Sequence, residues 1–174
     1  MKLPTRFTLK SLLLLVALSA VLLAWKALEL RRQIARRAIV ADIQMAGGHV
    51  TFAEDESGKP IDRVRRLYLA NTKLEDSILN RLWLLSESPV VSFNSTSFSD
   101  AQVHYLDDFD NLTELKLNGT RISPDGIRHL SEKHDITRIT LYHTTFKADD
   151  QQLLIELFPN AWEIALPGIR PYLR

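Results

Sequence analysis

The residues with the most familiar site chemistry are five histidines, and their spacing does not form a metal site. They are His49, His104, His129, His134 and His143. His129 and His134 stand five positions apart, whereas two ligands on one face of a helix would stand four apart. The run Asp107, Asp108 and Asp110 lacks the glycine and the distal glutamate of a calcium loop. We therefore expect no metal ion and no cofactor.

Four threonines follow one another at intervals of 24 residues, at Thr72, Thr96, Thr120 and Thr144. A catalytic threonine needs an oriented base beside it, and no such base recurs with these residues. Their hydroxyls are better suited to bonding backbone groups in a tight turn that follows a strand. The sequence also has no glycine-rich phosphate loop and no pair of nucleophile and base. We expect a structural ladder of threonines, no catalytic residue, no enzyme and no small-molecule substrate.

The same apolar frame recurs around each threonine. Its positions are Val64, Leu67, Leu69, Thr72 and Leu74; then Leu112, Leu115, Leu117, Thr120 and Ile122; then Ile136, Ile139, Leu141, Thr144 and Phe146; with a weaker copy at Ser88, Val91, Phe93, Thr96 and Phe98. A fixed period of this length is typical of a solenoid. Within each L-x-L pair both residues point inward and their neighbours outward, which predicts one short strand per repeat.

Apolar pairs three residues apart follow each strand and predict a helical return segment. The pairs are Leu79 and Leu82, Val103 and Leu106, Ile127 and Leu130, and Gln151 and Leu154. Gln151 breaks the pattern, and we expect Leu153 and Leu157 to take over its packing.

The spacing L-x-x-L-x-L-x-x-(N/C/T) resembles the leucine-rich repeat, with Thr where that family most often has Asn or Cys. The resemblance covers about residues 62–166 and ends in a partial unit at Ala161, Ile164 and Leu166, displaced by one residue. The chain looks most similar to short membrane-anchored leucine-rich-repeat proteins of planctomycete-type bacteria. The resemblance implies an α/β solenoid of about four to five repeats of 24 residues, with parallel strands on the concave side and helices on the convex side. It also implies a protein partner.

The outward positions of the predicted strands would form the concave face. The first column holds Arg66, Val90, Glu114, Arg138 and Glu163; the second holds Tyr68, Ser92, Lys116, Thr140 and Ala165; the third holds Ala70, Asn94, Asn118 and Tyr142. Tyrosine and arginine commonly anchor protein interfaces. The candidate partner-binding residues are Arg66, Tyr68, Glu114, Lys116, Asn118, Arg138, Thr140 and Tyr142. The alternative is a plain solvated sheet in which the charged residues are ordinary cross-strand pairs.

An uncharged apolar run near the N-terminus predicts a membrane anchor. Residues 11–25 carry no charge, and residues 7–28 together would reach spanning length. Lys10 and Lys26 flank the run, and Trp25 lies where an interfacial aromatic residue would sit. The alternative is a cleavable signal peptide, with cleavage at residues 17–19 and an exported, soluble product. We favour the uncleaved single-pass anchor, whose orientation the basic residues on both sides leave open.

A helix is expected to continue from the apolar run to residue 46, with an apolar stripe at Leu30, Ile34, Ala35, Ile39 and Ile43. The two glycines at residues 47–48 would end it, before a strand at residues 49–52 and a turn at 54–60. The predicted layout is a basic N-terminus and anchor at residues 1–28, a stem helix and N-terminal cap at 29–61, the leucine-rich-repeat domain at 62–166 and a C-terminal cap at 167–174.

The formal net charge of +1 is divided unevenly along the chain. Residues 1–37 hold eight Lys and Arg and one acid, which leaves 14 of the 22 basic and 20 of the 21 acidic residues in the rest. An acidic body does not suit nucleic acid, whereas a basic stem suits anionic lipid headgroups. The hypothesis is a non-catalytic, membrane-anchored module that binds another protein. The alternative is a structural or scaffold subunit of a membrane assembly, with Trp83 and Tyr105 on the convex side as its interface.

Overall fold

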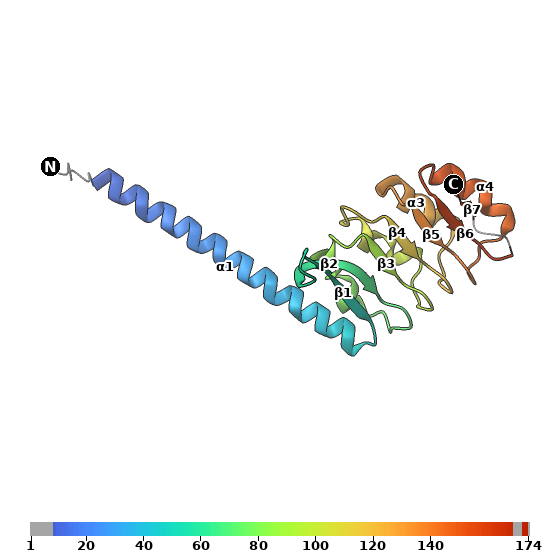
Figure 1. Ribbon diagram of the computed structural model, residues 1–174, viewed down its shortest axis with the longest axis horizontal. Helices are drawn as coiled ribbons and strands as arrows, with labels where there is room; N and C mark the ends of the chain where they lie inside the picture. Colours follow the sequence, from blue (N-terminus) through green and yellow to red (C-terminus); the bar gives the residue numbers. More distant parts are fainter. Residues whose placement is uncertain (1–8, 169–171, 174) are drawn as a thin grey trace. The chain divides into compact units, whose positions relative to one another are not determined.

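The computed structural model describes residues 9–168 and 172–173 of the 174-residue chain. It is a mixed α/β fold with an N-terminal apolar helix and one open sheet, whose strands follow in sequence order from β1 to β7 (Figure 1). The chain divides into two compact units, Met1–Arg37 and Ala38–Arg174. The elements, in which η denotes a 3₁₀ helix, are α1 (Leu9–Met45), β1 (His49–Glu54), β2 (Pro60–Tyr68), α2 (Asp76–Leu79), η1 (Leu82–Leu85), β3 (Val90–Ser92), η2 (Asp100–Leu106), β4 (Glu114–Lys116), α3 (Pro124–Lys133), β5 (Arg138–Thr140), η3 (Ala148–Asp150), α4 (Gln151–Leu157), β6 (Glu163–Ala165) and β7 (Tyr172–Leu173).

The first unit consists of the larger part of α1, which is long and apolar enough to cross a membrane. Its apolar side chains are exposed around the helix, and Leu15, Val21 and Leu23 are each more than half exposed. A helix that is apolar all round needs an apolar surrounding, such as a bilayer or a protein core. The predicted span at residues 7–28 lies on this helix, except for residues 7 and 8, which lie outside the described residues together with Lys2 and Arg6.

The last turns of α1 belong to the second unit. Ile39 and Ile43, four residues apart, are fully buried, whereas Leu30 and Ile34 are 58% and 59% exposed. Burial of the predicted apolar stripe is thus limited to the part that belongs to the second unit, Ile39 and Ile43. At the end of the helix, Gly47 has a φ of 92°. The Gly47 and Gly48 N–H groups donate to the carbonyls of residues 44 and 43, the bonding pattern of a Schellman motif.

The sheet combines antiparallel ends with a parallel centre. β1 pairs with β2 in an antiparallel hairpin, and β7 pairs antiparallel with β6. The strands from β2 to β6 are parallel and share one register, in which Arg66, Val90, Glu114, Arg138 and Glu163 lie side by side. Each strand with its return segment is called a coil below. Successive coils are thus offset by 24 residues, and the last by 25.

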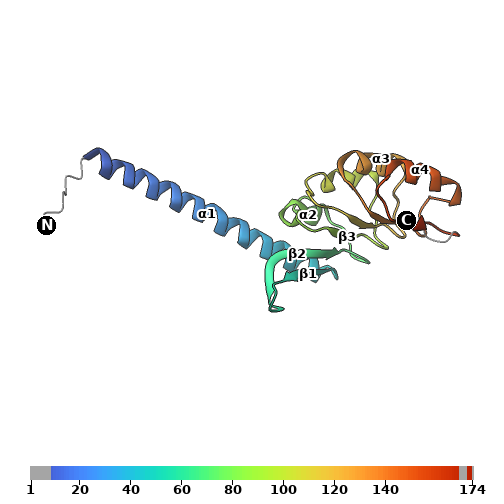
Figure 2. The same ribbon diagram turned by 45° about the horizontal axis from the view of Figure 1, so that its top comes forward.

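The core lies between the sheet and the helical connections, which lie together on one side of the sheet in Figure 2. The inward residues of all four predicted L-x-L pairs are fully buried, at Leu67 and Leu69, Val91 and Phe93, Leu115 and Leu117, and Ile139 and Leu141. The prediction of which side chains face the core is therefore confirmed. The rings of Phe93 and Phe98 stack with their centroids 4.0 Å apart and fill the second coil.

The return segments are helical, as predicted, but they are not uniform. η2 carries the buried pair Val103 and Leu106 on a 3₁₀ helix, in which residues i and i+3 lie above one another. A capping box at Ser99 starts this segment. α3 is an α-helix of ten residues that begins with Ser123 as N-cap and Pro124 in its first turn, both of which favour an α-helical start.

The last return segment packs differently from the prediction. Leu154 is fully buried as predicted, but Phe158 joins it in the core, whereas Leu153 and Leu157 are only half-buried. Leu154 and Phe158 are four residues apart, the spacing that puts two side chains on one helical face. Residues 169–171 and 174 of the predicted C-terminal cap lie outside the described residues, while β7 closes the sheet beside β6.

Leu117→Ala should lower the free energy of unfolding by about 2–5 kcal/mol, because the fully buried side chain would leave a cavity. Lys116→Ala is the matched control: its neighbour Glu114 keeps a second cationic partner, so the loss should stay below about 1 kcal/mol. Denaturant unfolding of both variants measures the difference. Equal losses would contradict the assignment of Leu117 as inward and Lys116 as outward.

Candidate functional site

The face of the sheet opposite the helical connections carries the predicted concave residues, and we call it the open face. Its two columns of side chains are Arg66, Val90, Glu114, Arg138 and Glu163, and Tyr68, Ser92, Lys116, Thr140 and Ala165. Strand pairing brings the members of each column together in the order predicted from the 24-residue period. The displacement by one residue in the last coil is also present, since it puts Glu163 beside Arg138.

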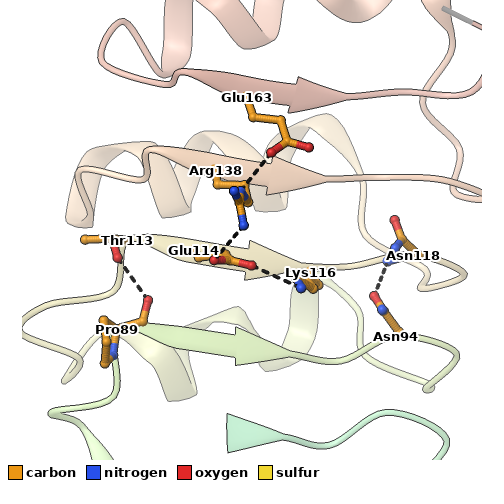
Figure 3. A network of polar contacts seen from close by, with 8 residues as sticks. All are labelled: Pro89, Asn94, Thr113, Glu114, Lys116, Asn118, Arg138 and Glu163. Atoms are coloured by element: carbon orange, nitrogen blue, oxygen red, sulfur yellow. Dashed lines mark hydrogen bonds and ion pairs between the residues drawn. The ribbon is translucent and has the colours of Figure 1, made fainter. Parts of the chain in front are cut away.

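Charged residues pair with one another in the C-terminal half of the open face (Figure 3). Glu114 lies between two cations, with its Oε1 3.1 Å from Lys116 Nζ and its Oε2 3.1 Å from Arg138 Nη1. Arg138 Nε lies 2.8 Å from Glu163 Oε2. The Glu114 side chain is only 16% exposed, so water screens these pairs incompletely. Two cations balance two carboxylates, and this half of the face offers a partner little net charge.

Arg138 is held by an aromatic ring as well. Its guanidinium lies 4.1 Å from the centroid of the Trp162 ring, a cation–π contact worth about 0.5–1 kcal/mol at an exposed site. Its Nε forms an ion pair with Glu163, but the contact does not have the geometry of a hydrogen bond. The buried Nε–H is therefore left without a hydrogen-bond acceptor. Contacts to Glu114, Glu163 and Trp162 together fix Arg138 as a link between three coils.

Part of the second column is covered instead of facing water. Ser92 and Ala165 are each 1% exposed, and Thr140 Oγ1 is buried without a hydrogen-bond partner. Ser92 lies in register between Tyr68 and Lys116, two much longer side chains. Neighbouring strands are only about 4.8 Å apart, so long side chains shield a small one between them. Pointing outward from the sheet is therefore not the same as being exposed.

Asn118 takes part in a hydrogen-bond ladder between coils (Figure 3). Its backbone N–H donates to Asn94 Oδ1 at 3.0 Å, and its own Oδ1 accepts the Tyr142 N–H at 2.8 Å. The side-chain oxygen of Asn118 thus serves the fold, although the sequence indicated a partner contact. Tyr142, at the end of this third column, has a half-buried side chain.

The threonine ladder makes the backbone bonds expected of it. Each hydroxyl donates to the carbonyl three residues earlier, at 2.6 Å for Thr72, Thr96 and Thr120 and 2.7 Å for Thr144. Two of the hydroxyls also accept a backbone N–H from two residues later, at 3.3 Å. The first three threonines are buried, and Thr144 is half-buried.

The residue before each threonine is a position that the sequence analysis missed. All four have a positive φ between 55° and 68°, in Asn71, Ser95, Gly119 and His143. Glycine adopts this left-handed conformation without strain and asparagine at low cost, whereas most residues lose about 1–2 kcal/mol. Asn71 and Gly119 could have indicated this conformation from the sequence, but Ser95 and His143 at the other two positions hid the pattern.

The N-terminal half of the open face keeps its polar groups available. Arg66 is exposed, its register neighbours are Thr51 and Val90, and it has no ion pair within the described part of the chain. Tyr68 is half-buried, and its ring stacks on His49 with centroids 6.4 Å apart. Among the predicted contact residues, Arg66 and Tyr68 are thus the least engaged by the fold.

Two of the other histidines, His129 and His134, lie on the helical side of the sheet. His129 Nε2 lies 2.8 Å from Asp107 Oδ1 and joins α3 to the end of η2. His134, which follows α3, is nine-tenths buried, and its Nε2 has no hydrogen-bond partner. Burial lowers the pKa of His134, although Asp107 acts in the opposite direction. Residues 9–168 and 172–173 contain no group of three or more side chains that could hold a metal ion.

Thr96→Val should lower the free energy of unfolding by about 1–3 kcal/mol, because the buried Phe93 carbonyl and Phe98 N–H both lose a partner. Thr120→Val removes one bond, and the Thr120 N–H still reaches the Leu117 carbonyl at 3.2 Å, so about 0.5–1.5 kcal/mol is expected. Thr96→Ser keeps the hydroxyl and serves as the control in denaturant unfolding. A Thr96→Val variant as stable as the wild type would contradict the ladder.

His134 should make the protein less stable in mild acid. Its pKa in the folded state is below the ordinary value of about 6.5, so the unfolded chain binds more protons as the pH falls past that value. The contribution is complete above about pH 6.5 and declines below it, down to the pKa of the folded state. Unfolding of the wild type and His134→Asn at pH 7.5 and 5.5 measures it. The variant should lose part of the pH dependence, and the exposed His104→Asn should keep it; identical slopes in all three would refute this.

No protein-family model and no curated protein matches the chain.

Proposed function

We propose that this chain is a non-catalytic, membrane-anchored module of the leucine-rich-repeat type that binds another protein. The observation that carries the proposal is the shared register from β2 to β6, in which the strand of each coil pairs in parallel with the strand of the next. Such stacking supports a solenoid of about four to five repeats, with the open face as its concave side and the helical connections as its convex side. Surfaces of this kind commonly bind proteins.

The continuity of α1 supports an uncleaved, single-pass anchor at about residues 7–28 over an exported soluble product. The helix runs without a break through the alternative cleavage site at residues 17–19 and ends at Met45. Cleavage there would leave the apolar residues Val21, Leu23 and Trp25 in water, which is unfavourable for three large side chains. Exposed basic residues beyond the span, such as Arg31 and Arg37, suit anionic lipid headgroups.

The candidate contact residues of the open face differ in how much they can offer a partner. Arg66, Tyr68 and Tyr142 are exposed or half-buried and make few contacts through their polar side-chain atoms. Glu114 and Arg138, in contrast, are held by their neighbours in other coils. A partner would therefore contact Arg66, Tyr68 and Tyr142 more readily than Glu114 and Arg138.

A second candidate function is that of a scaffold subunit whose interface is the convex side. It is favoured by Trp83 on η1, which is 46% exposed although most residues around it in the sequence are buried. An exposed tryptophan of this size is a common interface anchor. Tyr105 on η2 is half-buried, and its ring lies against that of His104.

A photo-crosslinking side chain placed at residue 142 or at residue 83 of the full-length protein separates the two functions. In native membranes we expect a protein adduct from residue 142, found in the fraction that resists an alkaline carbonate wash. Residue 128, exposed on α3, serves as the control and should give no adduct. An adduct from residue 83 alone would favour the scaffold, and no adduct from either position would contradict both. Loss of the first twenty or so residues from the purified protein would replace the anchor with a signal peptide.

A further inference from the structure

We infer that the open face receives its partner at its N-terminal end and that the partner segment carries carboxylates: an acidic stretch of protein that docks on Arg66, Tyr68 and His49. This inference rests on the proposed function and adds to it the place and the charge of the partner. It starts from the uneven distribution of charge over the face.

The two halves of the face differ in whether their charges are already neutralised. In the C-terminal half, Glu114 and Glu163 pair with Lys116 and Arg138. In the N-terminal half, Arg66 stands between Thr51 and Val90, which carry no charge. A guanidinium presents a planar set of donors that fits a carboxylate in a bidentate manner. Arg66 is therefore the charged group of the face that is ready to take an external carboxylate.

Two further arginines on β2 strengthen the positive potential at this end. Arg63 and Arg65 are exposed, and neither forms an ion pair among the residues that the structure describes. Residues 38–174 as a whole are acidic, with 20 acids against 14 bases. An acidic partner is repelled by most of this unit and attracted to the arginines of β2, which directs it to one place.

Apolar and aromatic groups beside Arg66 favour a protein segment over a membrane surface. Val90 and Tyr68 are half-buried, and His49 stacks on the Tyr68 ring. Arginine and tyrosine around a partly desolvated floor are the composition of a protein hot spot. Lipid headgroups, in contrast, are bound mainly by long exposed cations and by apolar side chains that enter the bilayer.

The test uses the full-length protein in nanodiscs of neutral phosphatidylcholine and two fluorescein-labelled ten-residue peptides. One peptide alternates Glu with Tyr, and the other has Gln in place of every Glu. In fluorescence anisotropy we expect binding of the Glu peptide alone, with an affinity that falls as salt rises. Arg66→Ala should weaken it by about tenfold and Arg66→Lys by less, since lysine keeps the charge and loses the planar fork. Arg128→Ala on α3 removes the same charge elsewhere and should change the affinity by less than about twofold.

Several results would overturn the inference while the proposed function stands. One is that neither peptide binds although the crosslinker at residue 142 still captures a protein. Another is that Arg66→Ala and Arg128→Ala weaken the Glu peptide equally, which would indicate attraction to net charge alone. A third is that Arg66→Ala abolishes binding to phosphatidylserine vesicles while the peptide does not bind, which would make the arginines a lipid site. Loss of peptide binding and of every crosslink would count against the proposed function as well.

Discussion

The turn after each strand has to begin at the same position of the repeat, because backbone hydrogen bonds between coils fix the register of neighbouring strands. The Leu69 N–H donates to the Ser92 carbonyl at 2.8 Å, and the same bond recurs 24 residues later between Phe93 and Lys116. The turn that follows each of these bonds needs a residue with positive φ and then a threonine whose hydroxyl closes the turn. The inward leucines can stack only if this pair of residues stays in step from coil to coil.

This constraint also explains why most charged side chains of the open face are paired within the fold. A register that aligns the core aligns the outward side chains too, so charges on adjacent strands fall within reach of one another. Glu114, Lys116, Arg138 and Glu163 then satisfy each other, and Asn94 and Asn118 supply backbone N–H groups with an acceptor. The side chains that the fold engages least, Arg66 and Tyr68, lie where the series of paired residues ends.

The sequence predicted the period, the inward residues, the threonine bonds and the order of the columns, since all of these follow from one repeated spacing. It could not predict how much of Ser92 or Thr140 is covered, because burial depends on the length of side chains in other coils. The use of 3₁₀ helices was also missed, because a spacing of three residues fits both kinds of helix. The left-handed positions escaped because four different residue types occupy them and because Ser95 is an unusual choice for that conformation.

The burial of Ile39 and Ile43 on the last turns of α1 decides where a protease could remove the apolar helix without unfolding the rest. A protease that cut α1 before Ala38 would free the whole of the second unit with its core complete. A cut only about two turns later, near Met45, would separate two fully buried isoleucines from the sheet, and removing such side chains costs several kcal/mol, about 2–5 for each one. Cleavage in the basic stretch around residues 31–37 would thus leave the second unit folded, whereas cleavage at the glycines would unfold it.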